Sequence, residues 1–370
     1  MLRLFLLAQR RMLSSAGYKI KRMLKRPVKP LFINFIVTYV CNSRCIMCDI
    51  WKKYDTGNKK YNKSPADELT VSDITYFAKR NKEFLSDLKS IGFTGGEAFL
   101  KKDIVEIIRG LHRELPRVDV GVQTNGLLPE MIKARIKDIL EFYPGFKIAV
   151  SLDGIGNIHD EVRGIKDAYD KAIATIRYAK ELGITGITCG MTLTPANFDK
   201  IKEVAAKVES LGCEFSCFLA ENSDYFGTVD GKNKLNRRQL DAIAGQLKDF
   251  SYHYFMDNLR LQISGKAKRT LPCYSGYTSY VIDPYGDLRP CILRDESFGN
   301  IKDALLRDMV DLGTSWMLRQ KLQSCKCWCE CEVSSSAIVA PLDVVKWLLK
   351  SKNKPAILKS FNKKTLIKRL

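Results

Sequence analysis

Apolar and polar positions along the first two thirds of the chain predict strands and helices in alternation. Runs rich in β-branched and aromatic residues predict six strands, at residues 31–40, 88–94, 118–123, 147–152, 184–193 and 212–220. Apolar residues at helical spacing fall between them, at residues 70–85, 103–114, 130–142, 168–182 and 198–210. This alternation favours βαβ units and a parallel sheet. Six strands are fewer than a closed eight-unit barrel needs, so we expect a partial (β/α)6 TIM-like barrel or an open doubly wound sheet.

The pattern changes after about residue 235. A helix and the segment 252–263 lead into a stretch from Cys273 to Cys291, where turn-forming residues are flanked by strand formers. This stretch predicts a hairpin with a cysteine at each end. We therefore expect four parts: a basic amphipathic extension (1–30), the partial barrel (31–235), a linker helix with a small cysteine-rich domain (236–335), and a basic amphipathic tail (336–370).

Net charge changes this picture only at the two ends. Residues 1–30 carry nine Lys and Arg with no acid, and residues 344–370 carry another nine with no acid, so eighteen of the +20 charges lie there. Because the body is nearly neutral, nucleic acid is not the expected partner. The basic ends, studded with apolar residues, suit either peripheral contact with an anionic membrane surface or helices packed on the body.

The sequence also bears on where the protein works. Most of the twelve cysteines are too closely grouped to pair comfortably as disulfides, which predicts metal ligation in a reducing compartment. We expect a cytoplasmic protein, at the inner membrane surface if the basic ends bind lipid. The Arg-rich, acid-free start is also typical of a mitochondrial presequence, which would place a eukaryotic chain in the matrix.

Three cysteines directly after the first predicted strand form the most informative motif. Cys41, Cys45 and Cys48 lie in one loop, and loops after the strands of such sheets form the active-site face. Three thiolates can ligate three irons of a [4Fe–4S] cube and leave the fourth iron open for chemistry. A zinc knuckle is the alternative, but it needs a fourth Cys or His nearby, and none lies between Cys48 and His112.

This C-x3-C-x2-C loop resembles the signature of the radical S-adenosylmethionine (SAM) superfamily. That resemblance implies a catalytic [4Fe–4S] cluster, reductive cleavage of SAM to a 5′-deoxyadenosyl radical, and hydrogen abstraction from a substrate. It also implies an electron donor such as a flavodoxin or ferredoxin. The substrate classes that we consider are a peptide, a sugar and a lipid-linked precursor.

The same resemblance assigns a set of residues to SAM. Gly95, Gly96 and Glu97 match the family's glycine-glycine-glutamate turn, although Ala98 stands where the family often has proline. Polar residues at the ends of later strands complete the expected SAM contacts, namely Asn125, Ser151, Asp153, Arg163, Thr192 and Asn197. From residue type alone, each of them could instead be a loop cap or turn former.

A second group of cysteines resembles the SPASM and twitch extensions of this superfamily, which carry auxiliary clusters. The hairpin supplies Cys273 and Cys291, and the downstream quartet is Cys325, Cys327, Cys329 and Cys331. Six thiols fit one auxiliary [4Fe–4S] cluster of the twitch kind better than two, and zinc is the alternative. Cys189, Cys213 and Cys217 lack such a motif and are expected to be small core residues.

Two other functions compete with a radical enzyme. A cysteine-rich zinc module that binds RNA would spread basic residues over the body instead of confining them to the ends. An inactive scaffold would keep the fold without the chemistry, although the intact Cys41 motif argues against it.

Overall fold

The computed structural model describes residues 16–21, 23–24, 26–54, 63–228, 231–269, 271–322 and 325–350, without the side chains of residues 330, 331, 349 and 350. Three parts of the expected organisation lie outside the described residues. They are residues 1–15 of the N-terminal extension, residues 351–370 of the tail, and the Cys331 side chain. In the described part, no helix is both long enough and apolar enough to cross a membrane.

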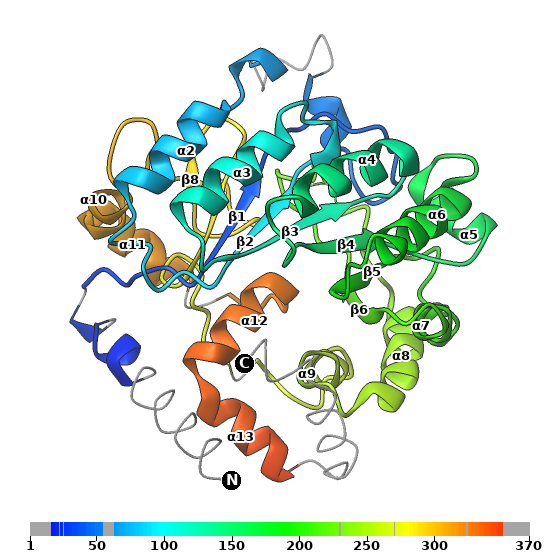
Figure 1. Ribbon diagram of the computed structural model, residues 1–370. Coiled ribbons are helices and arrows are strands. Elements are labelled where there is room, and N and C mark those ends of the chain that lie inside the picture. Colours follow the sequence, from blue (N-terminus) through cyan, green and yellow to red (C-terminus); the bar gives the residue numbers. More distant parts are fainter. Residues whose placement is uncertain are drawn as a thin grey trace, which may run out of the picture.

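The centre of the molecule is an eight-stranded sheet in the order β6-β5-β4-β3-β2-β1-β7-β8 (Figure 1). Each of β1 to β6 pairs in parallel with its neighbour, as the alternating pattern predicts. The six are β1 (Phe32–Ile36), β2 (Ser90–Thr94), β3 (Asp119–Thr124), β4 (Lys147–Ser151), β5 (Ile187–Leu193) and β6 (Glu214–Leu219). The partial barrel expected from the sequence is confirmed.

Helices follow the strands and cover one face of this sheet (Figure 1). They are α2 (Val71–Arg80), α3 (Ile104–Glu114), α4 (Pro129–Leu140), α5 (Asn157–Arg163), α6 (Ala168–Glu181) and α7 (Ile201–Ser210). Helix α2 begins with a capping box, in which Thr70 and Asp73 satisfy each other's backbone N–H groups. Alternate strand residues such as Ile33, Ile91 and Val120 are buried against these helices and form the main core.

The opposite face of the strands carries polar or small residues in the middle of β1 to β4, although Phe32, Ile36 and Phe218 on this face are apolar. At the positions that alternate with the core residues, the strands carry Asn34, Gly92, Gly121, Gln123 and Ala149, all of which line a cavity. Because side chains on one strand point alternately to opposite faces, these residues form the inner wall of the partial barrel. The small side chains on this wall leave the barrel interior open.

The predicted hairpin is present, and it extends the main sheet. Strand β7 (Ser279–Ile282) pairs antiparallel with β8 (Leu288–Arg289) and parallel with β1. The sheet therefore has two strands more than the six that the pattern suggests. Sequence periodicity cannot reveal this pairing, because it depends on how a short distant strand meets the edge of β1.

Three helices from the last part of the chain, α9 (Tyr254–Ile263), α12 (Glu330–Val339) and α13 (Pro341–Lys350), line the cavity on the inner side of the barrel. α9 and α12 pack on each other, as do α12 and α13 (Figure 1). Helix α12 runs through residue 335, where a boundary was expected. The helices of this part are α8 (Arg237–Gln246), α9 (Tyr254–Ile263), α10 (Leu306–Asp311), α11 (Gly313–Leu322), α12 (Glu330–Val339) and α13 (Pro341–Lys350).

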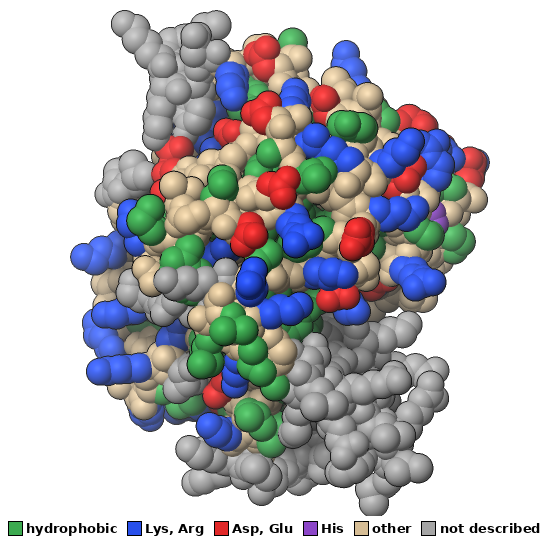
Figure 2. All heavy atoms as spheres, turned by 90° about the vertical axis from the view of Figure 1, so that its left-hand side faces the viewer, with side chains coloured by type: hydrophobic (Ala, Val, Ile, Leu, Met, Phe, Trp, Pro, Cys, Tyr) green, Lys and Arg blue, Asp and Glu red, His purple; other side chains and the backbone are tan. Residues whose placement is uncertain are grey.

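The described start of the basic tail packs on the body. The Trp347 indole N–H donates to Asp257 Oδ2 at 2.8 Å, and its ring meets Tyr254 edge-on. On the upper part of the face shown in Figure 2, Lys and Arg side chains are interspersed with Asp and Glu. This mixture does not resemble the basic stripe of a nucleic-acid-binding surface.

Candidate active site

The loop after β1 carries Cys41, Cys45 and Cys48 at the carboxyl end of the sheet, and all three are free thiols. Groups that stabilise sulfur anions surround two of them. The Ser43 amide donates to Cys41 Sγ at 3.4 Å, and the Ser43 hydroxyl lies 3.1 Å from Cys45 Sγ. The Arg163 guanidinium donates to Cys45 Sγ at 3.6 Å. Hydrogen-bond donors and a cation beside the thiols suit thiolate ligands of an anionic cluster.

Burial dominates the acidity of these thiols in the metal-free chain. It raises the pKa of Cys41 to about 12 and that of Cys48 to about 12. Among the residues that the structure describes, no three Cys, His, Asp or Glu side chains already converge as a metal site. Because the metal-binding form of cysteine is the thiolate, a metal bound by these residues would displace the thiol protons.

Helix α5 holds the cysteine loop in place from the side. The Arg44 and Ile46 amides donate to the carbonyl oxygens of Arg163 and Val162, both at 3.0 Å. Gly164 ends the helix at φ 63°, and a Cβ atom there would lie 2.3 Å from the Arg44 carbonyl oxygen. A glycine is required here both by its conformation and by this close approach.

Replacing Gly164 with alanine should therefore push the cysteine loop away from α5. We expect a loss of about 2–4 kcal/mol in unfolding free energy, together with reduced iron incorporation. Gly183→Ala is the matched control, because its φ is 83° but no atom lies within 4 Å of the added Cβ. It should lose only about 1 kcal/mol, measured by urea denaturation. Equal losses in the two variants would show that the contact with Arg44 does not matter.

Gly95, Gly96 and Glu97 lie where β2 ends beside the start of the cysteine loop. Cβ atoms on the two glycines would lie 2.4 Å from the Thr38 carbonyl oxygen and 2.3 Å from that of Val40. The Gly96 and Glu97 amides donate to these same two oxygens, both at 2.8 Å. The glycines thus allow protein backbone to approach protein backbone, which fixes where the cysteine loop begins.

The Glu97 carboxylate is 1% exposed and is bound by protein groups. It accepts hydrogen bonds from the Asn125 amide at 2.7 Å, the Thr124 hydroxyl at 2.8 Å and the Phe99 amide at 3.1 Å. Burial raises the pKa of Glu97, and these hydrogen bonds oppose the rise. The side chain of Asn125 continues the network, donating to Asn42 Oδ1 at 2.8 Å. Glu97 therefore joins the ends of β2 and β3 to the cysteine loop.

Asp153 and Arg163 form a buried ion pair beside Cys45. Their closest atoms are 2.6 Å apart, and their side chains are 0% and 8% exposed. Asp153 Oδ1 also accepts from the Thr192 amide at 2.7 Å. His159, whose pKa burial lowers to about 3, accepts from the Asp153 amide through Nδ1 at 2.9 Å. The pair therefore links α5 and the ends of β4 and β5 to one cluster thiol.

The remaining predicted SAM contacts divide into two kinds. Asn197 is fully used inside the protein, because Nδ2 donates to the carbonyls of Asp153 and Thr192 while Oδ1 accepts from Thr194. Within the described part of the chain, the Ser151 and Thr192 hydroxyls have no hydrogen-bond partner. These hydroxyls occupy inner-wall positions of β4 and β5. They are available to a ligand.

The sequence analysis missed the segment after β6, which crosses over the cysteine loop. The Tyr225 hydroxyl donates to the Gly95 carbonyl at 3.0 Å, and Asn233 Nδ2 donates to the Met47 carbonyl at 3.0 Å. Tyr225 also packs near Tyr39 in a small apolar cluster that includes Cys41 and Cys48. The adjacent aromatic residues Tyr225 and Phe226 in a polar segment were the available signal.

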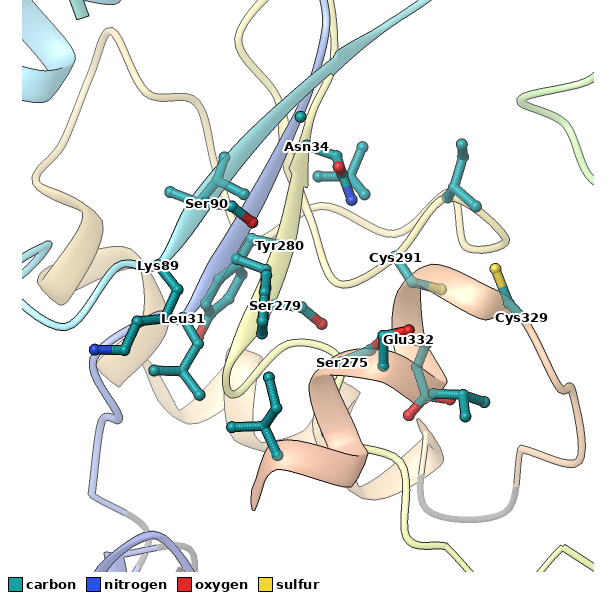
Figure 3. A pocket seen from close by; sticks show the side chains of 18 of the residues that line it. Leu31, Asn34, Lys89, Ser90, Ser275, Ser279, Tyr280, Cys291, Cys329 and Glu332 are labelled. Atoms are coloured by element: carbon teal, nitrogen blue, oxygen red, sulfur yellow. The ribbon is translucent and has the colours of Figure 1, made fainter. Parts of the chain in front are cut away.

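Five cysteines of the second group line a single cavity of about 1030 Å³. They are Cys273, Cys291, Cys325, Cys327 and Cys329. Figure 3 shows Cys291, Cys329 and Glu332 across the cavity from Asn34 and Ser90 on the sheet. The structure therefore brings together the hairpin thiols and the downstream thiols that the sequence analysis grouped, apart from Cys331.

Two arginines stand among these thiols. Arg294 donates to Cys325 Sγ at 3.2 Å, and Arg269 forms an ion pair with Glu332 at 2.6 Å. Burial raises the pKa of Cys291 to about 12. The pKa of Cys325 is lowered, mainly by a hydrogen bond with Cys327 and next by the hydrogen bond and charge of Arg294. As at Cys45, a guanidinium beside sulfur suits a site for an anionic metal–thiolate cluster.

Comparison with known proteins agrees with this geometry. The family model described as "Radical SAM superfamily" matches residues 35–208. The chain is 28% identical over 280 residues to the antilisterial bacteriocin subtilosin biosynthesis protein AlbA of Bacillus subtilis, covering 74% of this chain and 57% of AlbA. It is 23% identical over 282 residues to a probable GTP 3′,8-cyclase of Sulfurisphaera tokodaii, covering 74% of this chain and 84% of that protein.

A solved structure shares the fold. Streptococcus suis SuiB bound to precursor peptide SuiA matches with a TM-score of 0.62 at 16% identity, covering 88% of this chain and 74% of SuiB. The match extends well beyond residues 35–208 and so includes much of the cysteine-rich part.

Proposed function

We propose that the chain is a radical SAM enzyme that abstracts hydrogen from a peptide substrate, using a [4Fe–4S] cluster held by Cys41, Cys45 and Cys48. When bound, that cluster together with SAM supplies the 5′-deoxyadenosyl radical. The observation that carries the proposal is the large cavity on the inner wall of the barrel. It reaches Thr94 and Gln123, which lie one and two residues before Gly95 and Asn125.

The chain's own residues would bind and orient SAM at the top of this cavity. The free hydroxyls of Ser151 and Thr192 can each donate and accept a hydrogen bond. Arg163 is placed between Asp153 and Cys45, where its charge can also attract the SAM carboxylate. Glu97, Asn125 and Asn197 would act by holding the strand ends and the cysteine loop in position. Enclosure by the segment after β6 would exclude water from the radical.

We assign the second cysteine group to one auxiliary [4Fe–4S] cluster. Cys273 and Cys291 would supply two ligands, and two more would come from Cys325, Cys327, Cys329 and Cys331. The placement of five of these thiols along one cavity supports the assignment. A cluster there would face the inner wall of the barrel, so the substrate would lie between the two metal sites. The division into a barrel at residues 31–235 and a cluster domain at 236–335 is part of this proposal.

The charges of the cavity favour a peptide over a nucleotide. Its lining includes three basic residues, Lys89, Arg117 and Lys147, and three acids, Asp87, Asp119 and Glu332. A triphosphate would require a concentration of positive charge that this balance does not provide. Among the proteins that the chain resembles, AlbA acts in bacteriocin biosynthesis and SuiB binds a precursor peptide. We therefore place the chain with peptide-modifying enzymes and not with the GTP cyclases.

Two further partners belong to the proposal. A flavodoxin or ferredoxin would supply the electron, and the basic ends would hold the enzyme at the inner, cytoplasmic membrane surface. Sedimentation with anionic liposomes tests the membrane contact. Binding by the full chain should be lost when residues 1–26 and 344–370 are deleted. Failure of the full chain to bind would remove this part of the proposal.

The function itself is tested by anaerobic reconstitution with iron and sulfide, followed by reduction in the presence of SAM. We expect 5′-deoxyadenosine and methionine in equal amounts. SAM that stays intact in a fully reconstituted sample would reject radical chemistry. The zinc-module alternative predicts this negative result together with bound zinc.

A further inference from the structure

Two carboxamide side chains on the inner wall of the barrel are unusual for strands inside a sheet. Asn34 on β1 and Gln123 on β3 both line the cavity, and Gln123 is exposed although β3 has a neighbouring strand on each side. Within the described residues, neither side chain makes a hydrogen bond. Both amides face the cavity, where a ligand that displaces water can pair with them.

Two glycines, which have no side chains, lie on the wall between the two amides. The register aligns Asn34 with Gly92 on β2 and Gly92 with Gly121 on β3, and Gln123 lies one inner-wall position further along β3. A Cβ atom at Gly92 would lie 2.5 Å from Asn34 Oδ1, which shows that the Asn34 amide leans over β2. We call Asn34, Gly92, Gly121 and Gln123 the amide strip.

We propose that the amide strip binds the main chain of an extended peptide segment, with Asn34 and Gln123 each pairing with a peptide amide. This inference rests on the proposed function and deepens it. A carboxamide both donates and accepts, as a peptide unit does, so one side chain can satisfy both groups of one unit. β1 and β3 are two strand spacings apart, about 10 Å. Because the Asn34 amide leans over β2, one extended chain lying over the strip can reach both amides.

The chemistry of the strip sets the class of ligand. None of its four residues carries a charge, whereas Lys89, Asp119 and Lys147 lie at or before the first residues of β2, β3 and β4. A ligand on the strip is therefore recognised by hydrogen bonds between uncharged groups. The strip makes no ion pair with the ligand's side chains. Such recognition depends on the main chain and tolerates different peptide sequences. The two glycines allow the ligand backbone to approach closely.

The test uses the reconstituted enzyme and two non-native probes. One is a pool of six-residue peptides with blocked ends and randomised sequence, made from fully deuterated amino acids. The other is a pool of carbon-deuterated hexoses. After reduction with SAM, mass spectrometry measures deuterium per 5′-deoxyadenosine formed. Carbon-bound deuterium does not exchange with water, so its transfer reports a substrate carbon held next to the radical.

We expect wild-type enzyme to take deuterium from the peptide pool and not from the hexoses. Asn34→Leu and Gln123→Met, which remove the hydrogen bonds at similar volume, should each lower the transfer ratio about tenfold. Gly92→Ala should lower it similarly by displacing Asn34. The matched controls are Gln320→Met, an exposed glutamine on α11, and Gly245→Ala on α8, whose Cβ would meet no atom within 4 Å. Both should keep the wild-type ratio.

The outcomes separate the inference from the proposed function. If wild-type enzyme forms no 5′-deoxyadenosine, the proposed function fails. If it forms 5′-deoxyadenosine but takes deuterium from the hexoses, or from neither pool, the peptide ligand is rejected. If it takes deuterium from the peptides and the strip variants transfer as much as the two controls, the amide strip is not where the peptide binds.

Discussion

Cys45→Ala should reduce 5′-deoxyadenosine formation to the level of a protein-free control. Three thiols in the loop after β1 leave no spare ligand, because the first 111 residues of the sequence hold no other Cys or His. Cys45 is also the thiol that the Arg163 guanidinium contacts, so its loss removes the ligand that has a cation beside it. Anaerobic reconstitution followed by chromatographic measurement of 5′-deoxyadenosine checks this result.

Cys217→Ala is the matched control for this experiment. Cys217 is 0% exposed in the core of β6, away from both cysteine groups. Its truncation should cost about 1 kcal/mol of stability and leave the product yield unchanged. Product from the Cys45 variant at the wild-type level would mean that this loop does not hold the reactive cluster.

Arg163→Met should lower the free energy of unfolding of the cluster-free chain by about 3–5 kcal/mol, since it leaves the Asp153 charge buried without its partner. Burial raises the pKa of Asp153 even though Arg163 opposes the rise, which shows how strongly the site disfavours a lone carboxylate. Urea denaturation under anaerobic conditions measures the loss. A double variant with Asp153→Asn should lose less than the sum of the single losses, because it removes the orphaned charge.

Lys202→Met serves as the comparison for an exposed ion pair. Lys202 and Asp249 are 2.6 Å apart, but their side chains are 55% and 59% exposed. Water and salt screen such a pair, so its loss should cost less than about 1 kcal/mol. Similar losses of unfolding free energy in the Arg163 and Lys202 variants would show that burial of the Asp153–Arg163 pair does not increase its contribution to stability.

The order of strands and helices could be predicted because it depends on local periodicity. All six barrel strands lie where the apolar pattern places them, and so do the helices between them except the short helix α5, which was not predicted. The pairing of β7 with β1 could not be predicted, because a strand of four residues carries no sign of its distant partner. Helix α12 was missed for a similar reason: alternating cysteines precede it, and its own sequence lacks a clear apolar face.

The candidate site was predictable as a set of residues but not as a set of contacts. The spacing of Cys41, Cys45 and Cys48 predicts that they are metal ligands, since close thiols have few other uses. The pattern cannot show that Gly95 and Gly96 pack on the backbone of residues 38–40. It also cannot show that the Asn197 side-chain amide donates to the backbone of Asp153. Asn34 and Gln123 were visible as polar residues within apolar strands. Their significance needed the cavity that only the folded chain defines.

The central claim is that the Cys41 loop holds an iron–sulfur cluster with one iron open to SAM. The most direct test is electron paramagnetic resonance of the reduced enzyme in a variant that lacks the six cysteines of the second group. The account predicts the signal of a single [4Fe–4S] cluster, and its g-values should shift when SAM is added. Zinc in place of iron, or an iron–sulfur signal unchanged by SAM, would contradict it.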